Sequence, residues 1–276
     1  MVPCSICLDQ NGYEYNNLSV NKSASLLPMA YFHVPGPENM AIFTTLIKMQ
    51  EKYPHAFYEN RKIVEVYGSF CGATWNGRTP NFKDKIYSVE QLDQIREEIE
   101  ELGIKLNLTW NNTAIKDTDV YDRLCNAITK VFHNGRHAIT VASPILFNYL
   151  KEKYPNYTYY QSVIAVEKDA HFNKKDERYD MFLINRHLNN NWEELLKIPL
   201  QERYRYEFLC NDACTPICDR SIHQAIGNAS LVDRKMNQIG MEYLCTLDHD
   251  FLIYNADKWP ITIKSEDIDT YLDNGY

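Results

Sequence analysis

Along the chain, short apolar runs alternate with segments in which apolar residues recur every three or four positions. The short runs are rich in β-branched and aromatic residues, which predicts strands, and the longer spacing predicts amphipathic helices. The predicted strands cover residues 29–34, 62–67, 104–109, 138–142, 159–166, 181–185 and 204–210. The predicted helices cover residues 38–52, 88–102, 118–134, 145–154, 191–198 and 220–229.

This alternation predicts parallel β-α units. A chain of 276 residues is long enough for a (β/α)8 TIM-like barrel, which we take as the expected fold. An open doubly wound sheet is the second choice, because the chain has no glycine-rich dinucleotide motif and no P-loop. No stretch of disordered composition divides residues 29–276, so they are expected to form one barrel domain, preceded by an arm at residues 1–28.

The helix at residues 88–102 has the clearest boundaries. Ser88 is a predicted N-cap, Gln91 stands at the capping-box position, and Gly103 follows the last turn. These three residues therefore predict both ends of the helix from local sequence alone.

The composition argues against a membrane protein and against a general affinity for polyanions. The chain has a net charge of −8, so it exerts no overall attraction on nucleic acid or anionic lipid. It lacks an apolar run of the roughly 20 residues that cross a bilayer, and its first residues do not resemble a secretion signal. We therefore expect a cytoplasmic protein without a membrane partner.

Eight cysteines are the most informative feature of the composition. In a reducing compartment, clustered cysteines are more often metal ligands or reactive groups than disulfides. Three of them form the cluster Cys210-x3-Cys214-x3-Cys218, and soft thiolates favour an iron–sulfur cluster or zinc. Only Cys4 and Cys7 have the spacing of a zinc-ribbon pair, and no second pair accompanies them.

The local sequence separates these cysteines by role. Cys214 and Cys218 flank Pro216 in a predicted loop, whereas Cys210 belongs to a predicted strand. Two further thiolates would complete a four-cysteine site, and Cys71 and Cys245 are the candidates. The remaining Cys125 lies within a predicted amphipathic helix and is expected in the core.

Other candidate residues follow the predicted strands, where barrels place their reactive groups. His33 and His223 are candidate proton donors, and Arg78 and Arg186 are candidates for holding an anionic substrate, with a solvated surface position as the alternative. Asn111, Asn112, Asn185 and His187 are expected at the same rim. The tyrosines of residues 154–160 are either a stacking surface for an aromatic ligand or part of the packing.

The cysteine segment resembles a known family. Residues 207–218, followed by Arg220 and His223, resemble the N-x-x-C-x3-C…R-x-x-H segment of the collagenase-like peptidase U32 family. Residues 66–71 with the Asn76-Gly77-Arg78 motif resemble its early cysteine loop, and residues 259–268 resemble its late I-x-P-E-D-L element. The resemblance extends over residues 29–276.

The resemblance implies a TIM-like barrel with an oxygen-sensitive 4Fe-4S cluster on Cys71, Cys214, Cys218 and Cys245. It also implies oxygen-independent hydroxylation or another modification of an RNA or a small aromatic substrate. Cys210, beside the cysteine pair, is an alternative ligand. Relatives continue beyond the position of Tyr276, so the barrel is expected to be incomplete at its C-terminus.

Two other functions are alternatives to a hydroxylation enzyme. A zinc-stabilised barrel without catalytic activity would serve as a binding or adaptor protein, paired with a related subunit or a second copy. A peptidase, as the family name suggests, has less support, because the chain contains no G-x-S-x-G motif, no H-E-x-x-H motif and no convincing Cys-His-Asn order.

Overall fold

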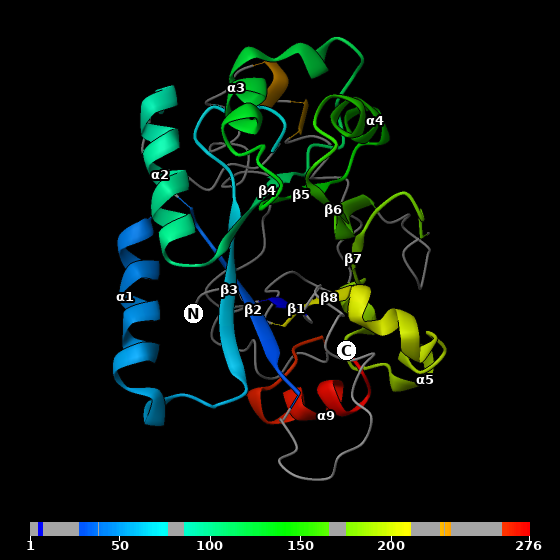
Figure 1. Cartoon of the computed structure of the whole chain (residues 1–276). Helices are drawn as coiled ribbons and strands as arrows, with labels where there is room; N and C mark the ends of the chain where they lie inside the picture. The colour runs from blue at the N-terminus through cyan, green and yellow to red at the C-terminus, as the bar shows by residue number, and fades with distance from the viewer. Residues whose placement is uncertain are drawn as a thin grey trace, which may run out of the picture.

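The computed structural model of the chain describes residues 5–7, 28–37, 39–76, 86–165, 175–210, 227–228, 230–232 and 261–276. Within these ranges, seven strands pair in parallel in sequence order and form a curled sheet flanked by helices (Figure 1). The parallel strands are β2 (Ala30–Pro35), β3 (Arg61–Gly68), β4 (Lys105–Trp110), β5 (Ala138–Val141), β6 (Thr158–Gln161), β7 (Met181–Leu183) and β8 (Tyr206–Leu209).

A short additional strand joins the two edges of this sheet. Strand β1 (Ser5–Cys7) pairs antiparallel with β2 and with β8, and so completes a closed ring of strands from β1 to β8. The α/β class and the parallel order that we expected are therefore confirmed. The full (β/α)8 arrangement is not, because the strand that closes the ring runs antiparallel and comes from the N-terminal stretch, where the sequence had predicted no strand.

Helices connect most of the parallel strands on the outside of the ring (Figure 1). The α-helices are α1 (Met40–Lys52), α2 (Val89–Glu101), α3 (Arg123–Val131), α4 (Pro144–Lys153), α5 (Trp192–Leu195) and α9 (Ile268–Asp273). Short 3₁₀ helices are η1 (Pro54–Ala56), η2 (Asp119–Tyr121), η3 (Val163–Ala165), η4 (Arg186–Leu188), η5 (Leu200–Arg205) and η7 (Ser265–Asp267).

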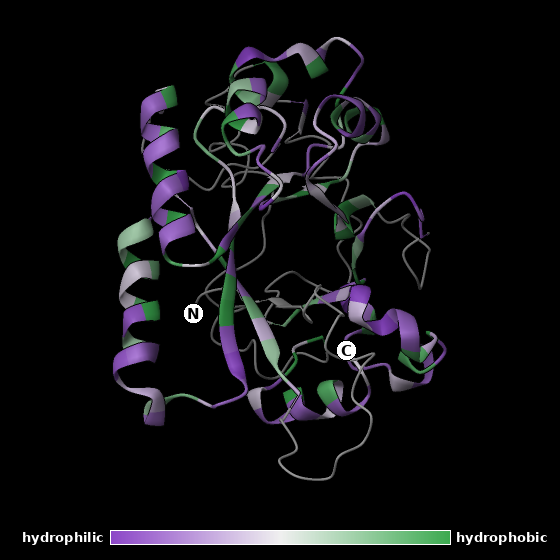
Figure 2. Cartoon of the chain, in the orientation of Figure 1, coloured by the Kyte–Doolittle hydropathy of each residue, from purple (hydrophilic) through white to green (hydrophobic). Residues whose placement is uncertain are grey.

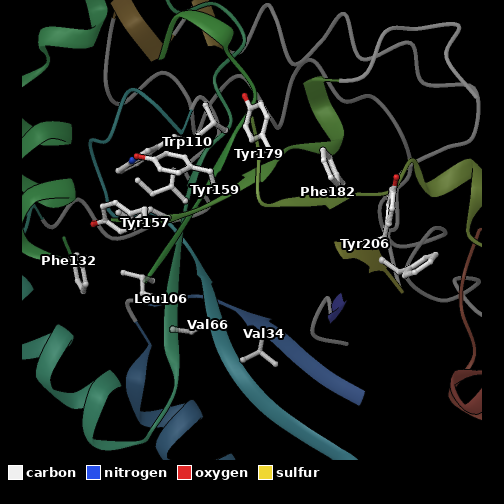
Figure 3. Packing of buried hydrophobic residues seen from close by; sticks show 14 of the residues in the cluster. Val34, Val66, Leu106, Trp110, Phe132, Tyr157, Tyr159, Tyr179, Phe182 and Tyr206 are labelled. Atoms are coloured by element: carbon white, nitrogen blue, oxygen red, sulfur yellow. The ribbon is translucent and has the colours of Figure 1, made fainter. Parts of the chain in front are cut away.

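The main hydrophobic core lies between the strands and these helices. Alternate residues of the strands, such as Val34, Val66 and Leu106, face the helices and belong to one large buried cluster (Figure 3). Helix α2 contributes Leu92 and Ile99 to the cluster, while most of its other residues are hydrophilic (Figure 2). This amphipathic pattern is what a helix on the outside of a sheet requires.

A second, smaller apolar cluster lies on the other face of the strands. Tyr160 belongs to it together with Met181 and Leu183, whereas Tyr159 and Phe182, which alternate with them, belong to the main core. Because successive strand residues point to opposite faces, this second cluster faces the inside of the ring. The inner side formed by β6 and β7, with Ala138 of β5, is therefore apolar.

Most of the predicted elements are confirmed to within a few residues, and the exceptions have local causes. The predicted helix at 118–134 is divided into η2 and α3, because the Asp122 side chain accepts a hydrogen bond from the Cys125 amide at 2.9 Å and caps α3. The predicted strand at 159–166 ends at Gln161, where Ser162 accepts a hydrogen bond from the Ile164 amide and starts η3. Most of the helix predicted at 220–229 lies outside the described residues.

None of the helices in the described ranges has the length and hydropathy that crossing a lipid bilayer requires.

Candidate acid–base site inside the barrel

The charged residues inside the ring come from β2, β3 and β8. His33, Glu65 and Glu207 each alternate with residues of the main outer core, which places their side chains on the inner face. His33 and Glu65 are register partners on neighbouring strands, just after an irregularity in the pairing of β2 with β3. Glu207 lies on β8, which is separated from β2 only by the antiparallel strand β1.

These three side chains meet at one ring nitrogen. Nδ1 of His33 lies 3.0 Å from Oε1 of Glu65 and 3.2 Å from Oε1 of Glu207. The three residues are 2%, 1% and 3% exposed, respectively. Such distances are those of ion pairs when the imidazole is protonated, so one histidine is shared between two buried carboxylates.

The charges of this group do not balance. Even with His33 protonated, two carboxylates leave one net negative charge within the three residues. Neither glutamate forms an ion pair with a Lys or Arg of the described residues, although Lys105 is the register partner of Glu65 on β4. Oε2 of Glu207 accepts no hydrogen bond within the described structure. A buried negative charge without compensation is costly, so a positively charged or proton-donating group would bind favourably here.

Polar and aromatic side chains continue this surface on neighbouring strands. The ring of Tyr160 stands edge-on to the imidazole of His33, with 6.3 Å between the ring centroids. On β4 and β5, Thr140 donates a hydrogen bond of 2.9 Å to Oδ1 of Asn107, and both residues are buried. The inside of the ring is therefore polar at β2, β3, β4 and β8 and at Thr140 of β5, opposite the apolar side at β6 and β7.

An imidazole between two carboxylates is suited to proton transfer. A carboxylate beside one ring nitrogen stabilises the imidazolium form and orients the ring, so the other nitrogen exchanges the proton. Here both carboxylates lie beside Nδ1, so Nε2 is the ring nitrogen that does not face them. The second carboxylate is then available to hold a donor group of the substrate.

The group does not have the arrangement of a metal site. Among the described residues, no set of three or more His, Cys, Asp or Glu side chains is placed to hold a metal ion.

Several of the residues predicted from the sequence lie outside the described ranges. Of the four cysteines expected to hold a cluster, only Cys71 is described; it lies in the loop after β3 and is buried. Cys210 is also buried and directly follows β8. The predicted residues outside the described ranges are Arg78, Cys214, Cys218, His223 and Cys245, together with Cys4.

The prediction of a common rim is confirmed for three of the described residues, whereas His33, which was predicted at the same rim, lies within β2. Cys71, Asn112 and Asn185 follow the carboxyl ends of β3, β4 and β7, which run in parallel. Arg186, which follows in η4, is 4% exposed, so the alternative of a solvated surface position is wrong. Cys125, which was expected in the core, is fully buried, and burial raises the pKa of its thiol.

His33 was predicted as a proton donor, but its two carboxylate partners were missed. The sequence does contain a signal for both of them. Glu65 interrupts a run of β-branched residues, and Glu207 stands between two aromatic residues of a short apolar strand. A carboxylate inside a predicted buried strand is rarely present without a partner or a function.

Comparisons with known protein families, with curated proteins and with solved structures found no match for this chain. The resemblance to the U32 family therefore stays a prediction.

Proposed function

We propose that this protein is an enzyme whose reaction depends on proton transfer by His33, with the substrate bound inside a variant TIM-like barrel. The observation that carries this proposal is the contact of one imidazole nitrogen with two buried carboxylates, at 3.0 and 3.2 Å. Glu65 orients the imidazole, Nε2 exchanges a proton with the substrate, and Glu207 is available to hold a donor group of the substrate. The substrate is a small molecule with an ammonium or another proton-donating group, which compensates the remaining negative charge.

The experiment that tests this proposal compares His33→Gln with the wild type. Purified protein is incubated, with and without oxygen, with a small-molecule extract of cells, and the consumption of individual compounds is followed by mass spectrometry. We expect the wild type to consume at least one compound, and His33→Gln to do so about 100-fold more slowly, the size typical of a lost acid–base group. His55→Gln, at an exposed histidine of η1, is the matched control and should retain full activity.

Equal rates for His33→Gln and the wild type would overturn the proposal, as would a folded wild type that consumes nothing. Should His33→Gln fail to fold, Glu207→Gln replaces it. This variant keeps the size of the side chain and removes one of the two charges at Nδ1, so it should also lower the rate.

A second proposal concerns the iron–sulfur cluster that the U32 resemblance implies. The observation in its favour is that Cys71 lies in the loop just beyond the carboxyl end of β3 and Cys210 directly follows the carboxyl end of β8. Cys71, Cys214, Cys218 and Cys245 would hold a 4Fe-4S cluster, which would supply electron transfer or Lewis-acid chemistry for an oxygen-independent hydroxylation. A cluster at this rim is compatible with proton transfer by His33.

Iron and sulfide analysis of anaerobically purified protein tests this second proposal. We expect about four iron and four sulfide per chain, and their loss in Cys214→Ala. Cys125→Ala is the matched control, because Cys125 is a buried core residue of α3 that faces Thr74 of the loop after β3, and this variant should keep its iron. A folded, iron-free wild type would overturn the proposal of a cluster and would leave the proposed role of His33 unaffected.

A further inference from the structure

A groove on the outside of the barrel has the features of an anion-binding site. It lies between η2 with α3 on one side and α4 on the other, two segments that are neighbours in Figure 1, and its volume is about 640 Å³. Its lining residues are Tyr121, Arg123, Asn126, Ala127, Lys130, His133, Tyr149, Lys153 and Tyr154. Neither Asp nor Glu is among them.

The floor of the groove is held in place by hydrogen bonds around Asn126. Its side-chain oxygen accepts from the hydroxyl of Tyr149 at 2.7 Å, from Nζ of Lys153 at 2.9 Å and from the hydroxyl of Tyr154 at 3.1 Å. Its amide nitrogen donates to the carbonyl groups of Val120 and Asp122, both at 2.9 Å. Asn126 therefore joins η2, α3 and α4, and a ligand would meet a surface that is already ordered.

Three cations face this floor. Lys153 donates to Asn126 at 2.9 Å and to the hydroxyl of Tyr149 at 2.6 Å, and its side chain lines the groove. Arg123 and Lys130 are exposed, and no ion pair with a described carboxylate neutralises either of them. They are seven residues apart and therefore on the same face of α3, about 10 Å apart along its axis.

The histidine in the groove does not add to this positive charge. Burial lowers the pKa of His133, and its Nε2 accepts a hydrogen bond from the Asn156 amide at 3.3 Å. By contrast, the hydrogen bond to Tyr149 raises the pKa of Lys153, which stays charged at neutral pH. The cations available to a ligand are therefore Arg123, Lys130 and Lys153.

The groove also offers an exposed aromatic surface. Tyr121 is 72% exposed and touches the ring of Tyr149 edge-on, with 6.0 Å between the centroids. The ring of Tyr149 is in turn covered by Nζ of Lys153 at 5.0 Å. A planar ring placed on Tyr121 would have an ordered neighbour on one side and the three cations within the same groove.

We propose that this groove binds a nucleoside phosphate, with the base stacked on Tyr121 and the phosphate held by Arg123, Lys130 and Lys153. An aromatic platform beside cations is the combination that recognises a nucleotide. The volume of about 640 Å³ is that of a small-molecule site. The net charge of −8 favours a single nucleotide over a nucleic-acid chain, because a long polyanion is repelled by the rest of the molecule.

Binding of adenosine 5′-monophosphate, measured by isothermal titration calorimetry or by NMR line shifts, tests this proposal. We expect saturable binding, about tenfold weaker in Lys130→Ala and in Arg123→Ala, because each variant loses one charged contact. Tyr121→Ala should weaken binding of the nucleotide and leave the weaker binding of inorganic phosphate unchanged. Lys48→Ala, at an exposed cation of α1 outside the groove, is the matched control and should bind like the wild type.

Three results would overturn the proposal. The first is an absence of binding at concentrations up to about 10 mM, the limit of weak affinity. The second is binding that Arg123→Ala and Lys130→Ala leave unchanged. The third is far tighter binding of a single-stranded oligoadenylate than of the mononucleotide, with this difference in affinity lost in Tyr121→Ala. That result would assign the groove to RNA.

Discussion

Buried histidines of this protein have very different surroundings. Nδ1 of His137 accepts a hydrogen bond from the Leu106 amide at 3.1 Å, and Nε2 lies 3.2 Å from Oε1 of Glu100. Both ring nitrogens thus have a partner that suits the neutral ring, and the residue connects β5 to β4 and α2. His33 instead places one nitrogen between two carboxylates. The first arrangement is typical of a structural residue, and the second is typical of a site that transfers protons.

The surroundings of His137 predict how stability depends on pH. Burial lowers its pKa below the ordinary value of 6.5, although the contact with Glu100 acts in the opposite direction. As the pH falls below about 6.5, the unfolded chain therefore takes up a proton that the folded protein does not. The free energy of unfolding should decrease between pH 7.5 and 5.5.

Urea denaturation at several pH values in this range measures the effect. His137→Gln, whose amide can accept from Leu106 and donate to Glu100, should show a smaller decrease than the wild type. The exposed His55→Gln is the control and should keep the wild-type slope. An identical slope in His137→Gln and the wild type would show that other groups produce the pH dependence.

The sequence predicted the ends of individual helices most accurately. The capping box at Ser88 was predicted, and the structure contains both of its hydrogen bonds, at 3.3 Å from the Gln91 amide and at 3.0 Å to the Gln91 side chain. Gly103, with φ +69°, follows this helix as expected. Such signals involve neighbours in the sequence, so they can be read without the fold.

Contacts between distant segments were not predictable in this way. The amide nitrogen of Asn112 donates to the Thr74 carbonyl at 2.8 Å and to the Gly227 carbonyl and the Ser230 hydroxyl, both at 3.2 Å. Its side-chain oxygen accepts from the Ala114 amide at 2.8 Å. One buried side chain therefore joins the loops after β3 and β4 to a segment more than a hundred residues later.

Replacing this side chain should destabilise the protein. Asn112→Ala removes four hydrogen bonds and leaves buried backbone groups without partners, so we expect it to lower the free energy of unfolding by about 2–3 kcal/mol. Asn111→Ala is the matched control, since the side-chain oxygen of Asn111 has no hydrogen-bond partner in the described structure. It should change the stability by less than about 0.5 kcal/mol. Denaturant unfolding of both variants measures these changes. Equal losses in the free energy of unfolding would contradict this role for Asn112.

For the whole molecule, the parallel order of β2 to β8 follows from the alternation of strands and helices, whereas the closure of the ring does not. Strand β1 is three residues long and lies in a stretch without periodicity, so only its pairing with β2 and β8 distinguishes it from a loop. The acid–base site also depends on the closure of the ring. His33, Glu65 and Glu207 are far apart in the sequence and meet only because the ring places β8 near β2.

This geometry also has a consequence for the stability of the molecule. Two buried carboxylates share one imidazole, and within the described residues no Lys or Arg pairs with either of them, so together with a protonated His33 they carry one excess negative charge. A group that serves only the structure would not be expected to keep this charge, whereas a binding site often costs stability. The functional and the structural interpretations of Glu207 therefore predict opposite signs for the effect of removing its charge.

The most direct test is the free energy of unfolding of Glu207→Gln at pH 7, measured by urea denaturation beside the wild type. If Glu65, Glu207 and His33 form a substrate site, neutralising one carboxylate leaves a balanced pair, and the variant should be more stable by about 1 kcal/mol or more. A loss of about 2 kcal/mol or more would show that Glu207 is a structural partner of His33, and would contradict the proposed acid–base site.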